Sequence, residues 1–126
     1  GDMGLTTRHE FKALIEVARP NIVQPDVGWV GGLTEMGEIA ALARAAGVRL
    51  VPHGYRSNVL LATNLAILAA APDDEWLEYS VSESPIRWIV TKERLSIGPD
   101  GRVGVPQGPG LGVTLDEDAI APYRYL

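Results

Sequence analysis

Two short apolar runs, each ending in a proline and an ionisable residue, constrain the fold of this 126-residue chain most strongly. They read IVQPD at residues 22–26 and LVPHG at residues 50–54. Apolar residues that include β-branched ones favour buried strands, and a proline cannot donate to the ladder of a central strand. Each run therefore predicts a short buried strand that stops beside an acid or base, Asp26 in one case and His53 in the other.

Helical patterns surround these strands. Thr7 and Glu10 have the spacing of a capping box, and apolar residues then recur at helical spacing until Pro20 ends the pattern. A second pattern opens at Thr34 and stops at Gly47, because glycine readily adopts the left-handed conformation that ends many helices. Both segments are predicted to be helices that cover the strands.

The alternation continues along the chain. Ser57 is the predicted N-cap of a helix over residues 58–70, and residues 76–79 have the pattern of a further strand. Strands and helices that alternate with short links indicate an α/β fold with parallel strands and right-handed crossovers. Residues 94–105 differ, because they alternate around a Pro-Asp-Gly turn and so predict a β-hairpin. The glycine-rich tail after it is expected to be irregular.

Composition excludes several classes of function. Sixteen acidic against 11 basic residues give a net charge of −5, which argues against a nucleic-acid or anionic membrane partner. The chain has no cysteine, so disulfides and thiolate metal sites are excluded. The longest apolar run, residues 59–72, is too short for a membrane span and is interrupted by Asn64. We expect a cytoplasmic protein.

Ionisable residues follow the predicted strands at intervals of about 25 residues, the length of one βα unit. They are Asp26, His53 and Glu78, and Asp2 takes the same place if a strand precedes residue 1. The carboxyl ends of parallel strands meet at one edge, so we expect these four side chains together there. Taken singly, each has a plainer interpretation: Asp26 as a turn residue, His53 as a loop histidine, Glu78 as a solvent-facing acid.

Adjacent strand ends bring Asp26 and His53 within reach of a hydrogen bond. Such a carboxylate fixes the tautomer and orientation of a general base. Asp2 and a second strand-end carboxylate would suit Mg²⁺, which prefers oxygen ligands. A zinc site is disfavoured, because the chain lacks cysteine and places only one histidine at a strand end.

Five segments together resemble the enolase superfamily, and within it the mandelate racemase/muconate lactonizing enzyme family and its acid-sugar dehydratases. The segments are GD at 1–2, IVQPDVGWVGGLTE at 22–35, VPHG at 51–54, WLEYS at 76–80 and GPGLGV at 108–113. The resemblance implies a (β/α)7β TIM-like barrel enzyme that binds Mg²⁺. It would remove the proton α to a carboxylate, stabilise the enediolate on the metal and, as a dehydratase, eliminate the β-hydroxyl.

The resemblance also implies roles for single residues. His53 matches the catalytic base or acid, with Asp26 as its dyad partner, and Glu78 matches the acid that hydrogen-bonds the substrate carboxylate. Asp2 matches a metal-binding carboxylate, at a position where the subgroup usually carries glutamate. Two residues just past the histidine are expected to line the sugar pocket: Tyr55 and Arg56.

A complete barrel takes about 250 residues, so the resemblance implies only its C-terminal half. Residues 1–80 would be βα units of that half, and residues 81–126, the hairpin and tail, would pack back on the barrel or cap. The other half and the cap are expected to precede residue 1, the 126 residues alone are expected to be inactive, and the complete enzyme to be a homo-oligomer. Two alternatives stay open: a racemase or epimerase of a 2-hydroxy acid, and a non-catalytic half-barrel that pairs with a partner.

Overall fold

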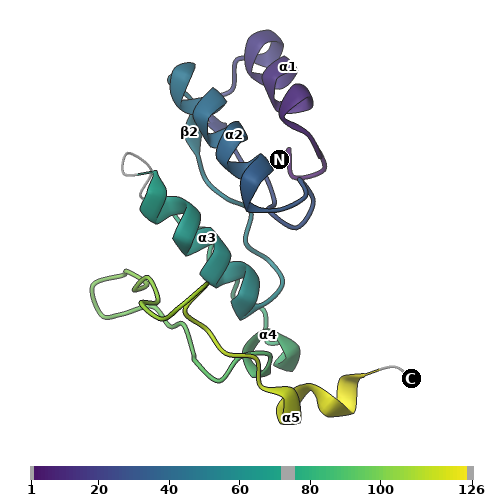
Figure 1. The fold of residues 1–126 in the computed structure, drawn as a ribbon. Coiled ribbons are helices and arrows are strands. Elements are labelled where there is room, and N and C mark those ends of the chain that lie inside the picture. The colour runs from purple at the N-terminus through teal and green to yellow at the C-terminus, as the bar shows by residue number, and fades with distance from the viewer. Residues whose placement is uncertain (1, 72–75, 125–126) are drawn as a thin grey trace.

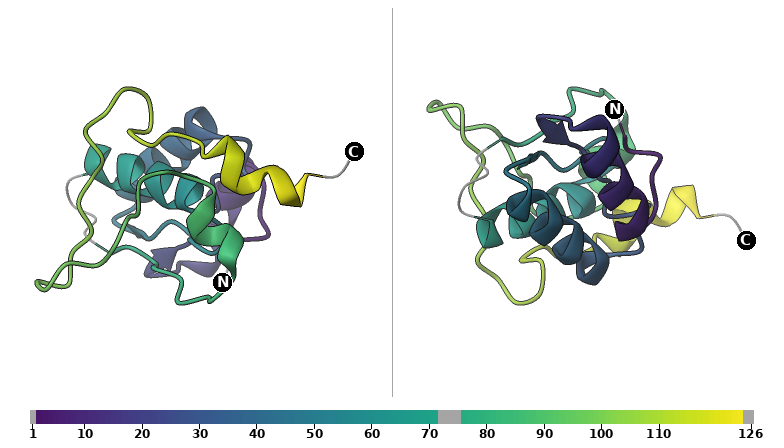
Figure 2. Two further views of the ribbon diagram at one scale, coloured as in Figure 1. Left: turned by 90° about the horizontal axis from the view of Figure 1, so that it is seen from below. Right: turned by 90° about the horizontal axis from the view of Figure 1, so that it is seen from above.

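The computed structural model describes residues 2–71 and 76–124 and has an α/β fold, as predicted (Figure 1). Its elements are α1 (Arg8–Ala18), β1 (Ile22–Val23), α2 (Leu33–Ala45), β2 (Arg49–Leu50), α3 (Asn58–Ala70), α4 (Pro85–Ile89), α5 (Glu117–Ile120) and the 3-10 helix η1 (Ala121–Tyr123). Helix α2 contacts both α1 and α3, and Figure 2 shows α5 and η1 extending away from the rest of the molecule. No helix in the described ranges is long and apolar enough to cross a membrane.

Strands β1 and β2 are parallel neighbours, which confirms the predicted crossover through α2. Val23 is paired with Leu50. The ladder continues past both strands, because the His53 N–H donates to the Pro25 carbonyl at 3.0 Å. Pro25 has no N–H to give, but its carbonyl still serves the ladder. The two strand ends are therefore in register at the position where each is followed by its ionisable residue.

One face of this sheet is packed and the other is open. Val23 and Leu50 are buried, whereas their neighbours Ile22 and Arg49 are exposed. The main core lies on the packed face and is built by the helices and the loop after β1: Phe11, Ile15, Val23, Val27, Val30, Met36, Ile39, Ala40, Ala43, Leu50 and Ile67. The side chains that alternate along each strand thus separate a helix-covered face from a free one.

A second core joins α3 to the C-terminal part of the chain. Its buried members are Leu61, Ala62, Leu65 and Leu95, with Leu77, Tyr79, Val103, Leu111 and Val113 packed against them. The glycine-rich tail has little regular structure of its own, as predicted, apart from α5 and η1. Helix α4 is a feature that the sequence patterns did not predict.

The predicted helix starts are correct for α1 and α3 but not for α2. Thr7 and Glu10 form the capping box, and Ser57 accepts a hydrogen bond from the first turn of α3. Helix α2 begins at Leu33 instead of Thr34, and its N-cap is Gly32 with φ of 109° and no side-chain cap. A residue with a Cβ is strained at that φ, so a glycine, not a threonine, starts the helix.

The predicted strand over residues 76–79 is wrong, since the structure has no strand among residues 76–80. Leu77 and Tyr79 pack into the second core, and Glu78 meets the backbone of Gly54 through its side-chain carboxylate. The N–H group that a ladder would use is therefore already taken. Strand β2 covers Arg49–Leu50, one residue earlier than predicted.

The predicted hairpin over residues 94–105 is only a turn. The Gly101 N–H donates to the Gly98 carbonyl at 3.0 Å, and the Gly98 N–H donates to the Arg102 carbonyl at 2.7 Å. Neither flank is a strand in the described structure. Glycine and proline follow one another closely here, and both residue types are unfavourable inside strands.

Candidate active site

The Asp26 carboxylate and the His53 imidazole meet beyond the C-terminal ends of β1 and β2. Oδ2 of Asp26 lies 2.8 Å from Nδ1 of His53, which confirms the predicted hydrogen bond. The Asp26 side chain is 1% exposed and that of His53 is 17% exposed. The other carboxylate oxygen of Asp26 accepts from the Gly28 N–H at 2.7 Å. Asp26 is therefore a turn residue and the histidine's partner at the same time.

This pairing decides which ring nitrogen of His53 is free for chemistry. A neutral imidazole carries one proton, and a carboxylate beside Nδ1 requires that proton to be there. Nε2 then has the free lone pair, and no hydrogen bond within the described residues engages it. A buried carboxylate is tolerated because both of its oxygens are hydrogen-bonded. The arrangement can accept a proton at Nε2 and stabilise the resulting imidazolium.

Glu78 is connected to the Asp26–His53 pair through Gly54, the residue after the histidine. The Gly54 N–H donates to Glu78 Oε2 at 2.8 Å. A Cβ on Gly54 would lie only 2.4 Å from the Glu78 carbonyl oxygen, so the approach requires glycine. The backbone of residue 54 thus ties Glu78 to the strand end that carries His53.

Asp2 lies on the side of β1 that faces away from β2. Its Oδ1 accepts from the Gln24 N–H at 2.8 Å. Pro25 bonds toward β2, and alternate residues of a parallel strand bond to opposite sides, so Gln24 bonds away from β2. The order across this edge is therefore Asp2, Asp26, His53 and Glu78.

The surroundings of Oδ2, the second carboxylate oxygen of Asp2, indicate whether this residue could bind a cation. Oδ2 is buried and has no hydrogen-bond partner among residues 2–71 and 76–124. A lone buried carboxylate oxygen fits an oxygen-liganded cation such as Mg²⁺. Within the part of the chain that the structure describes, no three acidic, histidine or cysteine side chains gather as a complete metal site. Asp2 therefore offers one ligand, not a whole site.

The two predicted pocket residues differ in what they contact. The Tyr55 ring is roughly parallel to the His53 ring, with an interplanar angle of 24° and centroids 6.4 Å apart, and Tyr55 is 64% exposed. The Arg56 guanidinium lies 5.7 Å from the centre of the Trp29 ring, in the loop after β1. Both residues therefore lie near the candidate site, Tyr55 beside the histidine and Arg56 against the Asp26 loop.

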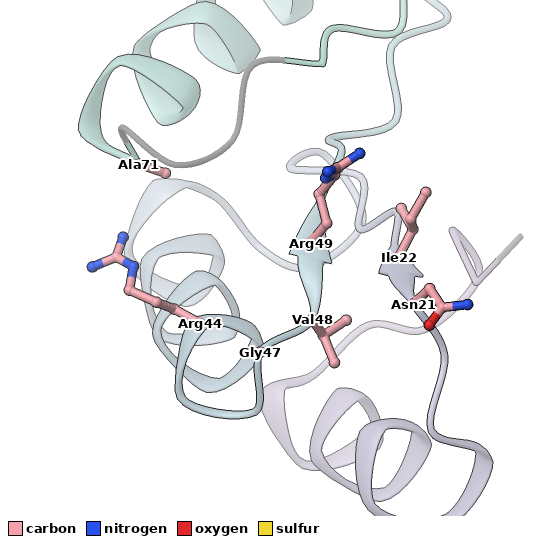
Figure 3. A pocket seen from close by; sticks show the side chains of 7 residues that line it. All are labelled: Asn21, Ile22, Arg44, Gly47, Val48, Arg49 and Ala71. Atoms are coloured by element: carbon pink, nitrogen blue, oxygen red, sulfur yellow. The ribbon is translucent and has the colours of Figure 1, made fainter.

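Two of the cavities lie beside β1 and β2. One of about 500 Å³ borders the open face of the sheet and includes Glu78 in its wall, together with Ile22, Gln24, Arg49, Val51, Trp76 and Leu77. Another of about 470 Å³ lies at the edge where the strands begin, and its lining includes Asn21 and Val48, the residues just before β1 and β2 (Figure 3). Only the first touches a residue of the candidate site.

Asn64 is a residue of the site that the sequence patterns missed. It lies in α3, is fully buried, and donates from Nδ2 to the His53 carbonyl at 2.8 Å. The available signal was a polar residue inside a largely apolar helix, a pattern that by itself does not indicate a contact with the candidate site.

Comparison with known proteins decides the family. The sequence profile of the enolase C-terminal domain-like family matches residues 1–119. The chain belongs to this family. Among curated relatives of this enolase-family chain, arabinonate dehydratase from Saccharolobus solfataricus is 35% identical over 118 residues, covering 94% of this chain and 31% of that protein. D-galactarolactone cycloisomerase from Agrobacterium fabrum is 36% identical over 112 residues, covering 82% and 29%.

Solved structures give the same assignment for this enolase-superfamily chain. A mandelate racemase/muconate lactonizing enzyme from Jannaschia sp. CCS1 is 33% identical with a TM-score of 0.84, over 97% of this chain and 31% of that one. A mutant L-talarate/galactarate dehydratase, liganded with Mg and L-glucarate, is 33% identical with a TM-score of 0.76, over 94% and 27%. The resemblance to the enolase superfamily is confirmed, and the chain spans less than a third of these proteins.

Proposed function

We propose that these residues are the C-terminal part of a Mg²⁺-dependent acid-sugar dehydratase with a (β/α)7β barrel. The observation that supports this proposal most strongly is the 2.8 Å hydrogen bond between buried Asp26 and His53 at the ends of adjacent parallel strands. Relatives named as dehydratases of arabinonate and L-rhamnonate support the substrate class. The substrate would be an aldonic or aldaric acid, and the product a 2-keto-3-deoxy acid.

His53 performs the proton transfers in this proposal. Nε2 takes the proton α to the substrate carboxylate, and Asp26 stays ionised and stabilises the imidazolium that forms. The same nitrogen then returns a proton to the β-hydroxyl, which leaves as water while the α,β double bond forms. The enol so produced becomes the 2-keto acid by taking up a proton at the β-carbon.

Glu78 and Asp2 flank this chemistry. Gly54 holds Glu78 Oε2, which leaves Oε1 to bond the substrate carboxylate through a shared proton. Mg²⁺, when bound, supplies positive charge that stabilises the enediolate. Asp2 Oδ2, which is buried and has no partner within the described structure, is the oxygen that would hold it, with further oxygen ligands from outside these residues.

Specificity and assembly are part of the proposal. Tyr55, next to the His53 ring, and Arg56, against Trp29, would contact sugar hydroxyls. The open face of β1 and β2 would close against the remaining strands of the barrel, and the complete enzyme would be a cytoplasmic homo-oligomer. Residues 81–126 would pack on the barrel or cap, as their contacts with α3 suggest.

A racemase or epimerase of a 2-hydroxy acid is the second candidate. It is favoured by the cycloisomerase among the relatives and by the mandelate racemase name of one solved structure. Such an enzyme would use the same dyad with a second base on the other face of the substrate. A half-barrel that pairs with a partner without catalysis is the third reading.

The test is a panel of aldonic and aldaric acids offered with Mg²⁺ to the complete protein that contains this chain. We expect a 2-keto-3-deoxy product from at least one acid, and no product after chelation of the metal. Inversion or exchange of the α-proton without elimination would contradict dehydration and support the second candidate. A panel with neither reaction, from protein that binds Mg²⁺, would contradict both catalytic proposals.

A further inference from the structure

A single peptide group connects His53 to Glu78. The carbonyl of the His53–Gly54 peptide accepts from Asn64 Nδ2 at 2.8 Å, and the N–H of the same peptide donates to Glu78 Oε2 at 2.8 Å. The N–H of His53 itself donates to the Pro25 carbonyl at 3.0 Å. The backbone beside the histidine is therefore held by β1, by α3 and by Glu78.

Asn64 is an unusual residue for its place in α3. It is fully buried, and its Oδ1 is buried with no hydrogen-bond partner among the described residues. Its amide can only be oriented with Nδ2 toward the His53 carbonyl, because that carbonyl only accepts. A buried oxygen without a partner is unfavourable. Packing alone would be better served here by an apolar side chain.

Space around the peptide is as restricted as its hydrogen bonds. A Cβ on Gly54 would lie 2.4 Å from the Glu78 carbonyl oxygen and 3.3 Å from Asn64 Nδ2. The peptide therefore fills the gap between α3 and residues 76–79. Because its two polar groups point in opposite directions, a rotation of the peptide plane breaks both hydrogen bonds together.

We infer that Asn64 is a positioning residue, which sets the orientation of His53 and Glu78 together through the peptide between them. The inference rests on the proposed function, in which these two residues contact the substrate. Hydrogen bonds at the two ends of one peptide polarise each other, so loss of the Asn64 bond weakens the hold on Glu78 as well. Displacement of catalytic groups by about 1 Å can cost about 10²-fold in rate.

Asn58 provides a matched control in the same helix. It is also fully buried, and its Nδ2 donates to Thr91 Oγ1 and the Glu93 carbonyl, both at 3.2 Å. Its Oδ1 is likewise buried without a partner in the part of the chain that the structure describes. It differs from Asn64 in what it holds, because its hydrogen bonds reach the segment after α4 and not the dyad. Both asparagines should matter for folding, but only Asn64 for His53.

The experiment compares Asn64→Leu with Asn58→Leu in the complete enzyme, on an acid that the wild type dehydrates. We expect Asn64→Leu to lower kcat by about 10- to 100-fold with KM changed much less, and Asn58→Leu to leave kcat nearly unchanged. Asn64→Ala replaces the leucine variant if the latter does not fold. An unchanged kcat in a folded Asn64 variant would overturn the inference, as would an equal loss in Asn58→Leu.

A second readout separates this inference from the proposed function. In protein labelled with ¹⁵N-glycine, we expect the Gly54 amide resonance to shift and its hydrogen exchange to accelerate in Asn64→Leu but not in Asn58→Leu. That result, with no acid dehydrated by the wild type, would refute the dehydratase and keep the link between Asn64 and the peptide. A Gly54 resonance unchanged by Asn64→Leu would overturn the link itself.

Discussion

The two edges of the parallel sheet carry different chemistry. At the edge where the strands end, Asp26 and His53 are hydrogen-bonded and largely buried, with Asp2 and Glu78 to either side. At the edge where they begin, the described residues that line a cavity of about 470 Å³ include Arg44, and none of them is acidic or a histidine (Figure 3).

The volume of a cavity does not identify the candidate active site. The cavities at the sheet have similar volumes, about 470 and about 500 Å³. What separates the edges is whether groups that can exchange a proton are held in contact with each other. The parallel arrangement explains why these gather on one edge, because the carboxyl ends of all its strands meet there.

Replacing His53 should have the largest effect. In the complete enzyme we expect His53→Asn to lower turnover by about 10²- to 10⁴-fold, since the general base is lost. Folding should be nearly intact, because an amide can still donate to the Asp26 carboxylate. The measurement is kcat together with thermal unfolding. His9→Asn, which changes the exposed histidine of α1, is the control and should leave kcat unchanged.

Asp26→Asn should come next. The side chain keeps an oxygen for the Gly28 N–H, but its NH₂ group would face Nδ1 and favour the wrong tautomer of the imidazole. We expect a loss of about 10²-fold in kcat with the fold retained. Arg44→Ala, at the edge where the strands begin, should leave kcat unchanged. A comparable loss of kcat in Arg44→Ala would contradict the claim that only the edge where the strands end takes part in catalysis.

Gly54→Ala should combine a smaller loss of activity with a loss of stability. The new Cβ would lie 2.4 Å from the Glu78 carbonyl oxygen, so the segments must move apart at a cost of about 1–3 kcal/mol. We expect about a tenfold lower kcat, and chemical denaturation measures the stability.

Gly37→Ala is the matched control for Gly54→Ala. Gly37 lies inside α2, and a Cβ there meets nothing within 4 Å. The change should stabilise the protein by about 0.5–1 kcal/mol, because alanine is the better helix former. Equal effects of the two substitutions would show that the approach at Gly54 is not close in solution.

The smallest effect is expected away from both edges, at the start of α1. Hydrogen bonds from the Thr6 N–H, and then from the Thr7 and Thr6 hydroxyls, hold the pKa of Glu10 below its ordinary value of 4.5. This stabilisation is present above the unfolded pKa and is lost as the pH falls from about 4.5 through the lower folded value. Glu10→Gln should therefore flatten the dependence of stability on pH in that acid range, measured by denaturation at several pH values.

Glu16→Gln is the control for that prediction. Glu16 lies on the same helix and has an exposed pair with Lys12 at 3.6 Å. Exposed pairs of this kind contribute little, so the acid dependence should stay as in the wild type. If Glu16→Gln flattened the pH dependence as much as Glu10→Gln, the capping box would not be its source.

Local rules predicted the first part of the chain and failed in the second. The capping box of α1, the Ser57 cap and the Val23–Leu50 pairing depend on neighbouring residues and on strand register, which a sequence displays. The meeting of Asp26 and His53 at the strand ends followed from the same register. Residues 76–79 depend on tertiary packing of Leu77 and Tyr79 against α3, which no local pattern contains.

Asn64 shows the same limit within the site. Its side chain reaches the His53 carbonyl only because α3 returns beside the strand end. The sequence displays a polar residue in a largely apolar helix but not the carbonyl that it binds. The start of α2 was misplaced for a different reason: the backbone conformation of Gly32, with φ of 109°, decides it, and side-chain capping rules do not describe that case.

The most direct test of the account is exchange of the substrate α-proton in D₂O. The complete enzyme is given Mg²⁺ and an acid sugar that it dehydrates, and the wild type should incorporate deuterium or release product. In folded His53→Asn, the rate of this reaction should be at least about 10²-fold lower. That result would assign the proton abstraction to the His53–Asp26 pair. Exchange in folded His53→Asn at the wild-type rate would contradict it.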